Sequence, residues 1–132
     1  MDLYYFDIPR HPSALLKADS HAPWYKKVKA ENEDKNDALA SIYATGNKHP
    51  DMPWDRCQMH ILFYCKTKHR RDLDNYMARS KKFIDACVFA GLITDDSSDV
   101  IGKLTAEFVI GDEKPATRMI LTRMAAELIW MD

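Results

Sequence analysis

The stretch CQMHILFYCK, residues 57–66, carries the clearest periodicity in the chain. Every second position is apolar, and this set consists of Cys57, Met59, Ile61, Phe63 and Cys65. A period of two residues is typical of a strand that buries one face. We therefore predict a strand over residues 57–66, with these five side chains in the hydrophobic core.

The residues before this strand predict another strand and a long helix. Residues 3–8 form a short stretch rich in aromatic side chains, which favours a strand. An irregular segment that contains prolines follows over residues 9–23. Apolar residues then recur at helical spacing over residues 24–45. Residues 31–37 within this helix are very polar, so they form either an exposed helical face or a break. Residues 46–55 contain two prolines and predict a loop.

The residues after the central strand predict one helix and two more strands. Apolar positions between Tyr76 and Ala90 recur at helical spacing, and Gly91 suits the C-cap of that helix. Residues 92–99 predict a turn. A second alternation follows, and it consists of Leu104, Ala106, Phe108 and Ile110. The turn-like residues 111–115 then predict a hairpin between this strand and residues 116–123.

The predicted element order is strand, helix, strand, helix, strand, strand. This order favours an α+β fold with a small mixed or antiparallel sheet and helices packed on it. The length of 132 residues predicts a single domain over residues 1–132. Exposed strand edges and a second apolar face, formed by Leu62, Tyr64 and Val109, suggest self-association.

Composition narrows the class of protein. Glycine and proline are few and 46% of the residues are hydrophobic, which indicates a folded chain. Three cysteines without a CxxC pair fit a reducing cytoplasm better than a disulfide framework. No apolar run is long enough to span a membrane, and the first residues do not resemble a signal peptide. We therefore expect a cytoplasmic protein without membrane contact.

The charge of the chain is near zero overall but uneven along it. A net charge of −1 and a pI near 6.5 count against a non-specific DNA binder. Residues 66–82, however, contain seven basic residues and two acids, a local excess of five positive charges. The basic residues are Lys66, Lys68, Arg70, Arg71, Arg79, Lys81 and Lys82. Such a strip can hold a phosphate backbone, although a solvated charged surface is the commoner explanation of a charge run.

A group of acids accompanies the basic strip. Residues two apart in an extended chain project to the same side, so Asp72 and Asp74 can face one ion. Asp95 or Asp96 can supply a third carboxylate, and Mg²⁺ prefers such oxygen ligands. Lys81 can offer a positive charge to the same phosphate.

The same residues also have ordinary structural explanations. Asp74 or Asn75 can cap the following helix, and residues 95–98 can form a polar turn. A straight helix over residues 78–90 would be about 20 Å long. The five residues that follow it return at most about 17 Å. Bringing Asp96 to Asp72 therefore requires a shorter or kinked helix, or a partner subunit that supplies Asp96.

Two other sets of residues have a functional and a structural explanation. Cys57, His60, Cys65 and His69 are zinc-ligand types, but strand alternation separates His60 from the two cysteines, which favours buried thiols. Trp24, Trp54 and Trp130 can stack on bases, although packing is the commoner role of tryptophan. We expect Trp54, in its proline-flanked loop, to be the most exposed of the three.

The segment RRDLDN at residues 70–75, followed by FIDACVFAGLITDD at residues 83–96, resembles the core of the RusA family of Holliday-junction resolvases from phages and prophages. The likeness covers residues 68–100, about a quarter of the chain. The matching residues are Arg70, Arg71, Asp72, Asp74, Asn75, Lys81, Asp85, Gly91, Asp95 and Asp96.

The resemblance implies a homodimeric, Mg²⁺-dependent endodeoxyribonuclease, with Mn²⁺ as an alternative ion, that resolves four-way DNA junctions by paired nicks. It maps the metal-binding carboxylates to Asp72, Asp74 and Asp96. The functional lysine maps to Lys81, with Arg79 and Lys82 as rivals. The residues expected to contact DNA are Lys68, Arg70, Arg71, Arg79 and Lys82. A non-catalytic DNA-binding dimer and a protein–protein adaptor remain alternatives.

Overall fold

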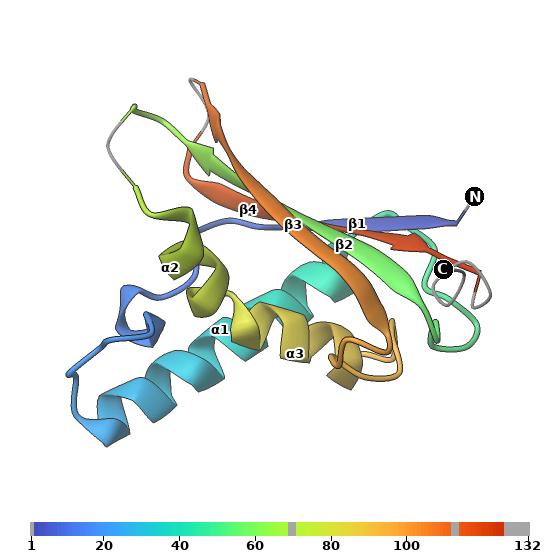
Figure 1. Cartoon of the computed structure of the whole chain (residues 1–132), viewed down its shortest axis with the longest axis horizontal. Coiled ribbons are helices and arrows are strands. Elements are labelled where there is room, and N and C mark those ends of the chain that lie inside the picture. The colour runs from blue at the N-terminus through green and yellow to red at the C-terminus, as the bar shows by residue number, and fades with distance from the viewer. Residues whose placement is uncertain (1, 69–70, 112–113, 126–132) are drawn as a thin grey trace.

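The computed structural model of the chain describes residues 2–68, 71–111 and 114–125. It has an α+β fold, in which helices lie on one face of a four-stranded mixed sheet (Figure 1). The strands are β1 (Leu3–Ile8), β2 (Cys57–Cys65), β3 (Ile101–Ile110) and β4 (Ala116–Arg123). The helices are α1 (Trp24–Ala44), α2 (Leu73–Arg79) and α3 (Lys81–Phe89), with a short 3₁₀ helix, η1 (Ala14–Leu16). No described helix combines the length and apolar content needed to cross a membrane.

The strands are arranged in the order β1-β4-β2-β3. β4 pairs antiparallel with both β1 and β2, whereas β3 pairs only with β2, in parallel. The predicted hairpin of β3 and β4 is therefore wrong, because the chain passes β2 after β3 and β4 enters between β1 and β2. The parallel pair β2–β3 is joined by α2 and α3, as a parallel connection requires. β3 consequently lies at an edge of the sheet.

The hydrophobic core lies between the sheet and the helices. The predicted buried face of β2, from Cys57 to Cys65, is confirmed, since all five of its alternating side chains are buried. Burial of a large apolar side chain contributes roughly 1.5–3 kcal/mol each. The residues that pack around them include Tyr4, Phe6, Ala38, Ile42, Phe83, Ala86, Cys87, Met119 and Leu121. All three cysteines are buried free thiols, and burial raises the pKa of Cys57 to about 11.

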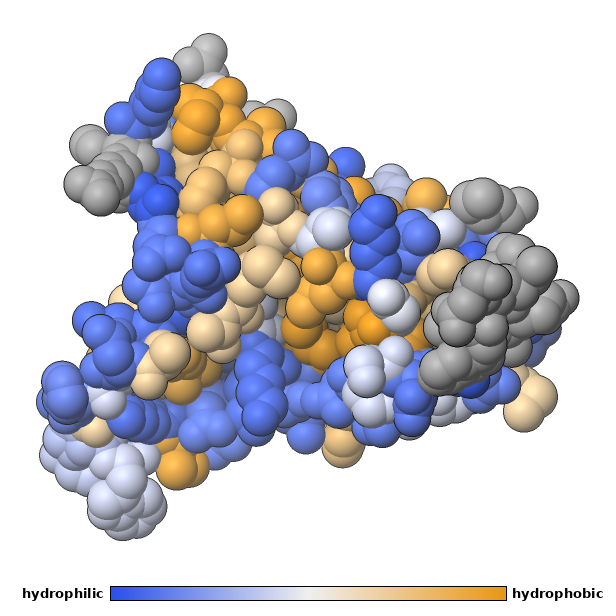
Figure 2. Space-filling view, in the orientation of Figure 1, coloured by the Kyte–Doolittle hydropathy of each residue, from blue (hydrophilic) through white to orange (hydrophobic). Residues whose placement is uncertain are grey.

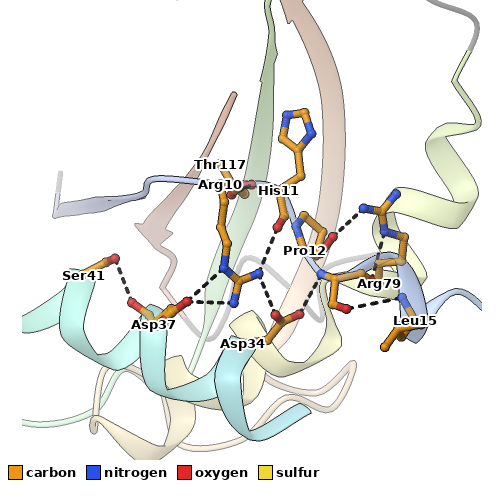
Figure 3. A network of polar contacts seen from close by, with 10 residues as sticks. Arg10, His11, Pro12, Leu15, Asp34, Asp37, Ser41, Arg79 and Thr117 are labelled. Carbon is orange, nitrogen blue, oxygen red and sulfur yellow. Dashed lines mark hydrogen bonds and ion pairs between the residues drawn. The ribbon is translucent and has the colours of Figure 1, made fainter. Parts of the chain in front are cut away.

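Helix α1 is continuous through its polar middle, so residues 31–37 do not break it. One residue of that stretch, Asp34, is buried. Its carboxylate lies 2.7 Å from Nη1 of Arg10 and accepts a 3.0 Å hydrogen bond from the backbone N–H of Ser13 (Figure 3). Arg10 also forms an ion pair with Asp37, one turn further along α1. This network holds the segment that follows β1 against the helix.

The opposite face of the sheet has no described helix over it (Figure 1). Polar side chains there pair across strands, as His60 does with Thr105 and Glu107. Leu62, Tyr64 and Val109 are half-buried on the same face. Self-association through this face stays a prediction.

Trp54 is only 7% exposed, so its predicted exposure is wrong. The residue forms a short parallel bridge to Ile93 just before β2 begins. Its backbone N–H donates to the carbonyl of Leu92, and its carbonyl accepts from the N–H of Thr94. This extra pairing holds the indole ring in the core cluster. The exposed tryptophan among the described residues is Trp24, at the start of α1, with 76% of its surface accessible.

Candidate functional site

The helix predicted after residue 74 is divided into α2 and α3 at Ser80. Ser80 is buried, and its hydroxyl donates a 2.8 Å hydrogen bond to the carbonyl of Tyr76. Its backbone N–H bonds to the carbonyl of Met77, three residues back instead of four. A serine that bonds back to the preceding turn is a recognised cause of a bend. The predicted helix is therefore interrupted at Ser80, but this break does not gather Asp72, Asp74 and Asp96 into one metal-holding group.

Asp72 and Asp74 lie at the N-terminal end of α2. Asp72 is the N-cap, with extended backbone angles, and its carboxylate accepts a 3.0 Å hydrogen bond from the backbone N–H of Asp74. The extended arrangement predicted for Asp72–Asp74 is wrong, because Leu73 and Asp74 are already helical. The cap is also Asp72, where the sequence had indicated Asp74 or Asn75. Both carboxylates are exposed at a helix end that favours negative charge.

Asp96 follows α3 and lines a groove together with Lys81. The groove has a volume of about 560 Å³ and lies between the two helices and β3. Lys81, Asp96 and Ser98 give it polar groups, while its apolar lining consists of Met77, Ala78, Ile84, Ile101 and Leu104. Figure 2 shows apolar surface between the helices and β3, bordered by hydrophilic surface. The structure thus places two of the predicted catalytic residues on one concave surface.

Asp95 and Asp96 have different surroundings. Asp95 is fully exposed, and hydrogen bonds from the backbone of Asp96 and the side chain of Ser97 lower the pKa of its carboxyl group. Partial desolvation, followed by the hydrogen bond and the charge of Asp85, raises the pKa of Asp96. Asp95 therefore serves the polar turn, whereas Asp96 faces the groove and a second carboxylate.

Asp85 is a member of this site to which sequence reasoning gave no role. Its carboxylate lies 3.1 Å from Nζ of Lys82, which in turn lies 3.3 Å from the carboxylate of Glu31 on α1. The hydrogen bond to Asp85 is the main cause that raises the pKa of Lys82. The three-residue spacing of Lys82 and Asp85 on a helix was the available signal, because side chains so spaced are neighbours.

The predicted metal-binding carboxylates do not gather in one chain. No three histidine, cysteine, aspartate or glutamate side chains among the described residues lie close enough to hold a metal ion. Asp72 and Asp74 lie at the start of α2, whereas Asp96 lies after the end of α3 beside Asp85. Carboxylate oxygens suit Mg²⁺, but their arrangement within this single chain does not fit a shared ion.

The predicted DNA-contacting residues divide into two groups. Lys68 is exposed, and Arg71 is half-buried and donates to the carbonyl of Thr67. Arg70 lies outside the described residues. Arg79 and Lys82, in contrast, have internal partners.

Arg79 connects α2 to the N-terminal segment. Its guanidinium donates hydrogen bonds to the carbonyl oxygens of Pro12 and Ser13 (Figure 3). It also lies 4.2 Å from the ring centroid of Tyr76. Because Ser13 in turn donates to Asp34, the same short segment links α2 to α1. In this conformation Arg79 therefore stabilises the fold around the site.

The residue types that suggested zinc are separated by the sheet. Cys57 and Cys65 lie on its buried face, while His60 lies on the opposite face, as the alternation predicted. His69 and Trp130 lie outside the described residues.

No model of a known protein family matches the chain, and no curated protein matches it significantly.

Proposed function

We propose that the chain is a divalent-metal-dependent endonuclease that resolves branched DNA, such as a four-way junction, by paired nicks as a homodimer. The observation that carries the proposal is the groove shared by Lys81 and Asp96. The RusA likeness gives roles to both residues, and they are separated by fifteen positions along the sequence. Lys81 is exposed on this groove, where its ammonium group can approach a DNA phosphate.

In this proposal Asp72, Asp74 and Asp96 are the ligands of Mg²⁺, or of Mn²⁺ in its place. Because they do not gather within one chain, we place the complete site between two copies, with Asp72 and Asp74 from one and Asp96 from the other. In this proposal, the DNA phosphates are contacted by Lys68, Arg70 and Arg71. Arg79 and Lys82 would first have to leave their internal partners to reach DNA.

The first test is cleavage of a synthetic four-way junction in Mg²⁺. Asp74→Asn is the informative variant, because Asp72 also caps α2 and its loss would disturb the helix. We expect Asp74→Asn to lower cleavage by about 100-fold or more, the order seen when one transition-state-stabilising group is lost. Asp99→Asn, an exposed aspartate in the same loop as Asp96, is the matched control and should cleave like the wild type. Equal cleavage by wild type and Asp74→Asn would refute the assigned role.

A mixing experiment tests whether the site lies between two copies. Asp74→Asn and Asp96→Asn chains are each expected to be inactive alone. A mixed dimer contains one site with both substitutions and one intact site if Asp96 is supplied by the partner, so nicking should return on mixing. If each site is built within one chain, the mixture stays inactive, and the placement between two copies is wrong.

The second candidate function is a non-catalytic DNA-binding dimer that keeps the fold. The observation that favours it is the absence of a metal-holding group among the described residues. Salt-sensitive binding of the junction, without nicking in Mg²⁺ or Mn²⁺, would support this candidate over the nuclease.

A further inference from the structure

Helix α1 begins with two exposed aromatic side chains. Trp24 is 76% exposed and Tyr25 is 58% exposed, and their rings pack edge to face with centroids 6.2 Å apart. Val28, one turn further on, is exposed as well. Aromatic side chains of this size usually bury most of their surface, as Trp54 does here. The core therefore does not account for the rings at this end of α1.

Lysines surround the two rings. Residues 17–29 contain four lysines (Lys17, Lys26, Lys27 and Lys29) and one acid, Asp19, a local charge of +3 with His21 neutral. Lys27 donates to the carbonyl of Ser20, and Nζ of Lys29 lies 4.0 Å from the carboxylate of Glu33. Neither Lys17 nor Lys26 has a side-chain partner within the described ranges. Lysines at a helix N-terminus oppose the helix dipole. The residues at this end are thus poorly suited to stabilising α1 itself.

The first turn of α1 supplies no negative charge of its own. The first turn of α1 contains no acidic residue, and its N-cap, Pro23, provides no side-chain hydrogen bond. The positive end of the helix dipole therefore adds to the charge of the lysines. Exposed rings beside a local excess of positive charge are the combination that binds unpaired nucleotides, in which bases stack on rings and phosphates contact lysines.

A lipid surface fits this end of the molecule less well. A membrane-surface helix needs an apolar face along its length. The later apolar positions of α1, such as Ala38 and Ile42, instead face the core. An anionic bilayer that lies along the helix would be repelled by the acidic residues of its middle, including Glu31 and Glu33. A single strand of nucleic acid that crosses only the first turn avoids these acids.

The aromatic end of α1 lies on the same side of the molecule as α2. Figure 1 shows it projecting beyond the sheet there. The segment from Arg10 to η1 joins the two helices, because Arg79 of α2 and Asp34 of α1 both bind Ser13 (Figure 3). This network fixes α2 relative to the middle of α1.

We propose that the N-terminal end of α1, formed by Trp24, Tyr25, Lys26 and Lys29, binds unpaired nucleotides, with Trp24 stacked on a base and the lysines against phosphates. The inference takes its ligand class, DNA, from the proposed nuclease function. It adds a contact for branched DNA that exposes unpaired nucleotides, away from the Lys81–Asp96 groove.

The test compares the full chain with Trp24→Ala and with Tyr43→Ala. Tyr43 is 70% exposed at the other end of α1, so it is a matched exposed aromatic control. Binding of labelled oligothymidine is measured by fluorescence anisotropy. Loss of one stacked base should weaken binding by roughly 5- to 150-fold in Trp24→Ala and leave Tyr43→Ala unchanged. The double variant Lys26→Gln with Lys29→Gln should reduce the slope of log K against log salt by about 1.4.

The outcomes separate this inference from the nuclease proposal. Trp24-dependent binding of oligothymidine without junction cleavage would refute the nuclease proposal and support the α1 contact. Cleavage by the wild type, with equal oligothymidine binding by Trp24→Ala and Tyr43→Ala, would overturn the α1 contact alone. Trp24-dependent binding to phosphatidylserine vesicles but not to oligothymidine would also overturn it, in favour of a lipid surface.

Discussion

Replacing Asp34 by asparagine should destabilise the protein far more than the same change at Asp37. Both carboxylates belong to α1 and both form ion pairs with Arg10 (Figure 3). Asp34 is buried, whereas the side chain of Asp37 is 53% exposed. The two substitutions therefore compare the loss of a buried partner of Arg10 with the loss of an exposed one. Asparagine has nearly the same shape as aspartate, so the comparison isolates the charge.

The expected loss in the free energy of unfolding depends on how each change leaves the charge of Arg10. Removing one partner of a buried ion pair typically costs about 3–5 kcal/mol, because the other charge stays buried. Arg10 is 33% exposed and would keep Asp37, so we expect a cost below that range, about 2–3 kcal/mol, for Asp34→Asn. An exposed pair contributes at most about 1 kcal/mol, so Asp37→Asn should cost less than that.

Urea unfolding followed by circular dichroism measures both changes. With a slope of about 1–3 kcal/mol per molar urea for a small domain, Asp34→Asn should lower the midpoint by about 0.7–3 M. Asp37→Asn should shift it by only a few tenths of that amount. Equal shifts for the two variants would show that Asp34 does not anchor the N-terminal segment, and the reasoning from burial would fail.

Two further predictions concern pH and the cap of α2. Burial is the main cause that lowers the pKa of His11 below its ordinary value of 6.5, so the unfolded chain binds the proton first and the free energy of unfolding declines as the pH falls through that value. His11→Gln should flatten this decline between about pH 7.5 and pH 5.5 in urea titrations, and an unchanged decline would mean that another group causes it. Asp72→Ala should cost about 1 kcal/mol through loss of the cap, and Asp74→Ala about half of that or less; thermal melts that rank them in the opposite order would contradict an N-cap at Asp72.

The strands could be located from the sequence, but their neighbours could not. Alternation in β2 correctly identified its buried face, because side-chain direction is a local property of an extended chain. In β3, Leu104 and Phe108 from the second alternation lie in register with Met59 and Phe63. The choice of neighbouring strand is not a local property. The alternating buried positions of β4 suit a strand between β1 and β2 as well as a hairpin partner of β3. The turn residues 111–115 favoured the nearer partner, and that prediction failed.

The candidate site was only partly predictable for a similar reason. Lys81 and Asp96 were identified by likeness to a family motif, and the structure places them on one groove. The cap at Asp72 depends on where α2 begins, and a helix boundary is poorly fixed by sequence. The burial of Asp34 had a signal, because it shares a four-residue spacing with Ala30 and Ala38. Its charge concealed that signal, since a lone aspartate is rarely buried without a partner such as Arg10.

The position of β4 also determines where the candidate site can be completed. By entering between β1 and β2, β4 leaves β3 as an edge strand, so Leu104 on its helix side stays exposed and contributes to the groove of Lys81 and Asp96. Had β4 paired beside β3 as a hairpin, a further strand would have flanked that groove. An edge strand with unpaired backbone groups and an exposed apolar side chain is a surface that a second chain can cover. The strand order therefore leaves the Lys81–Asp96 groove beside an open edge of the sheet, which a second copy could cover in the proposed dimer.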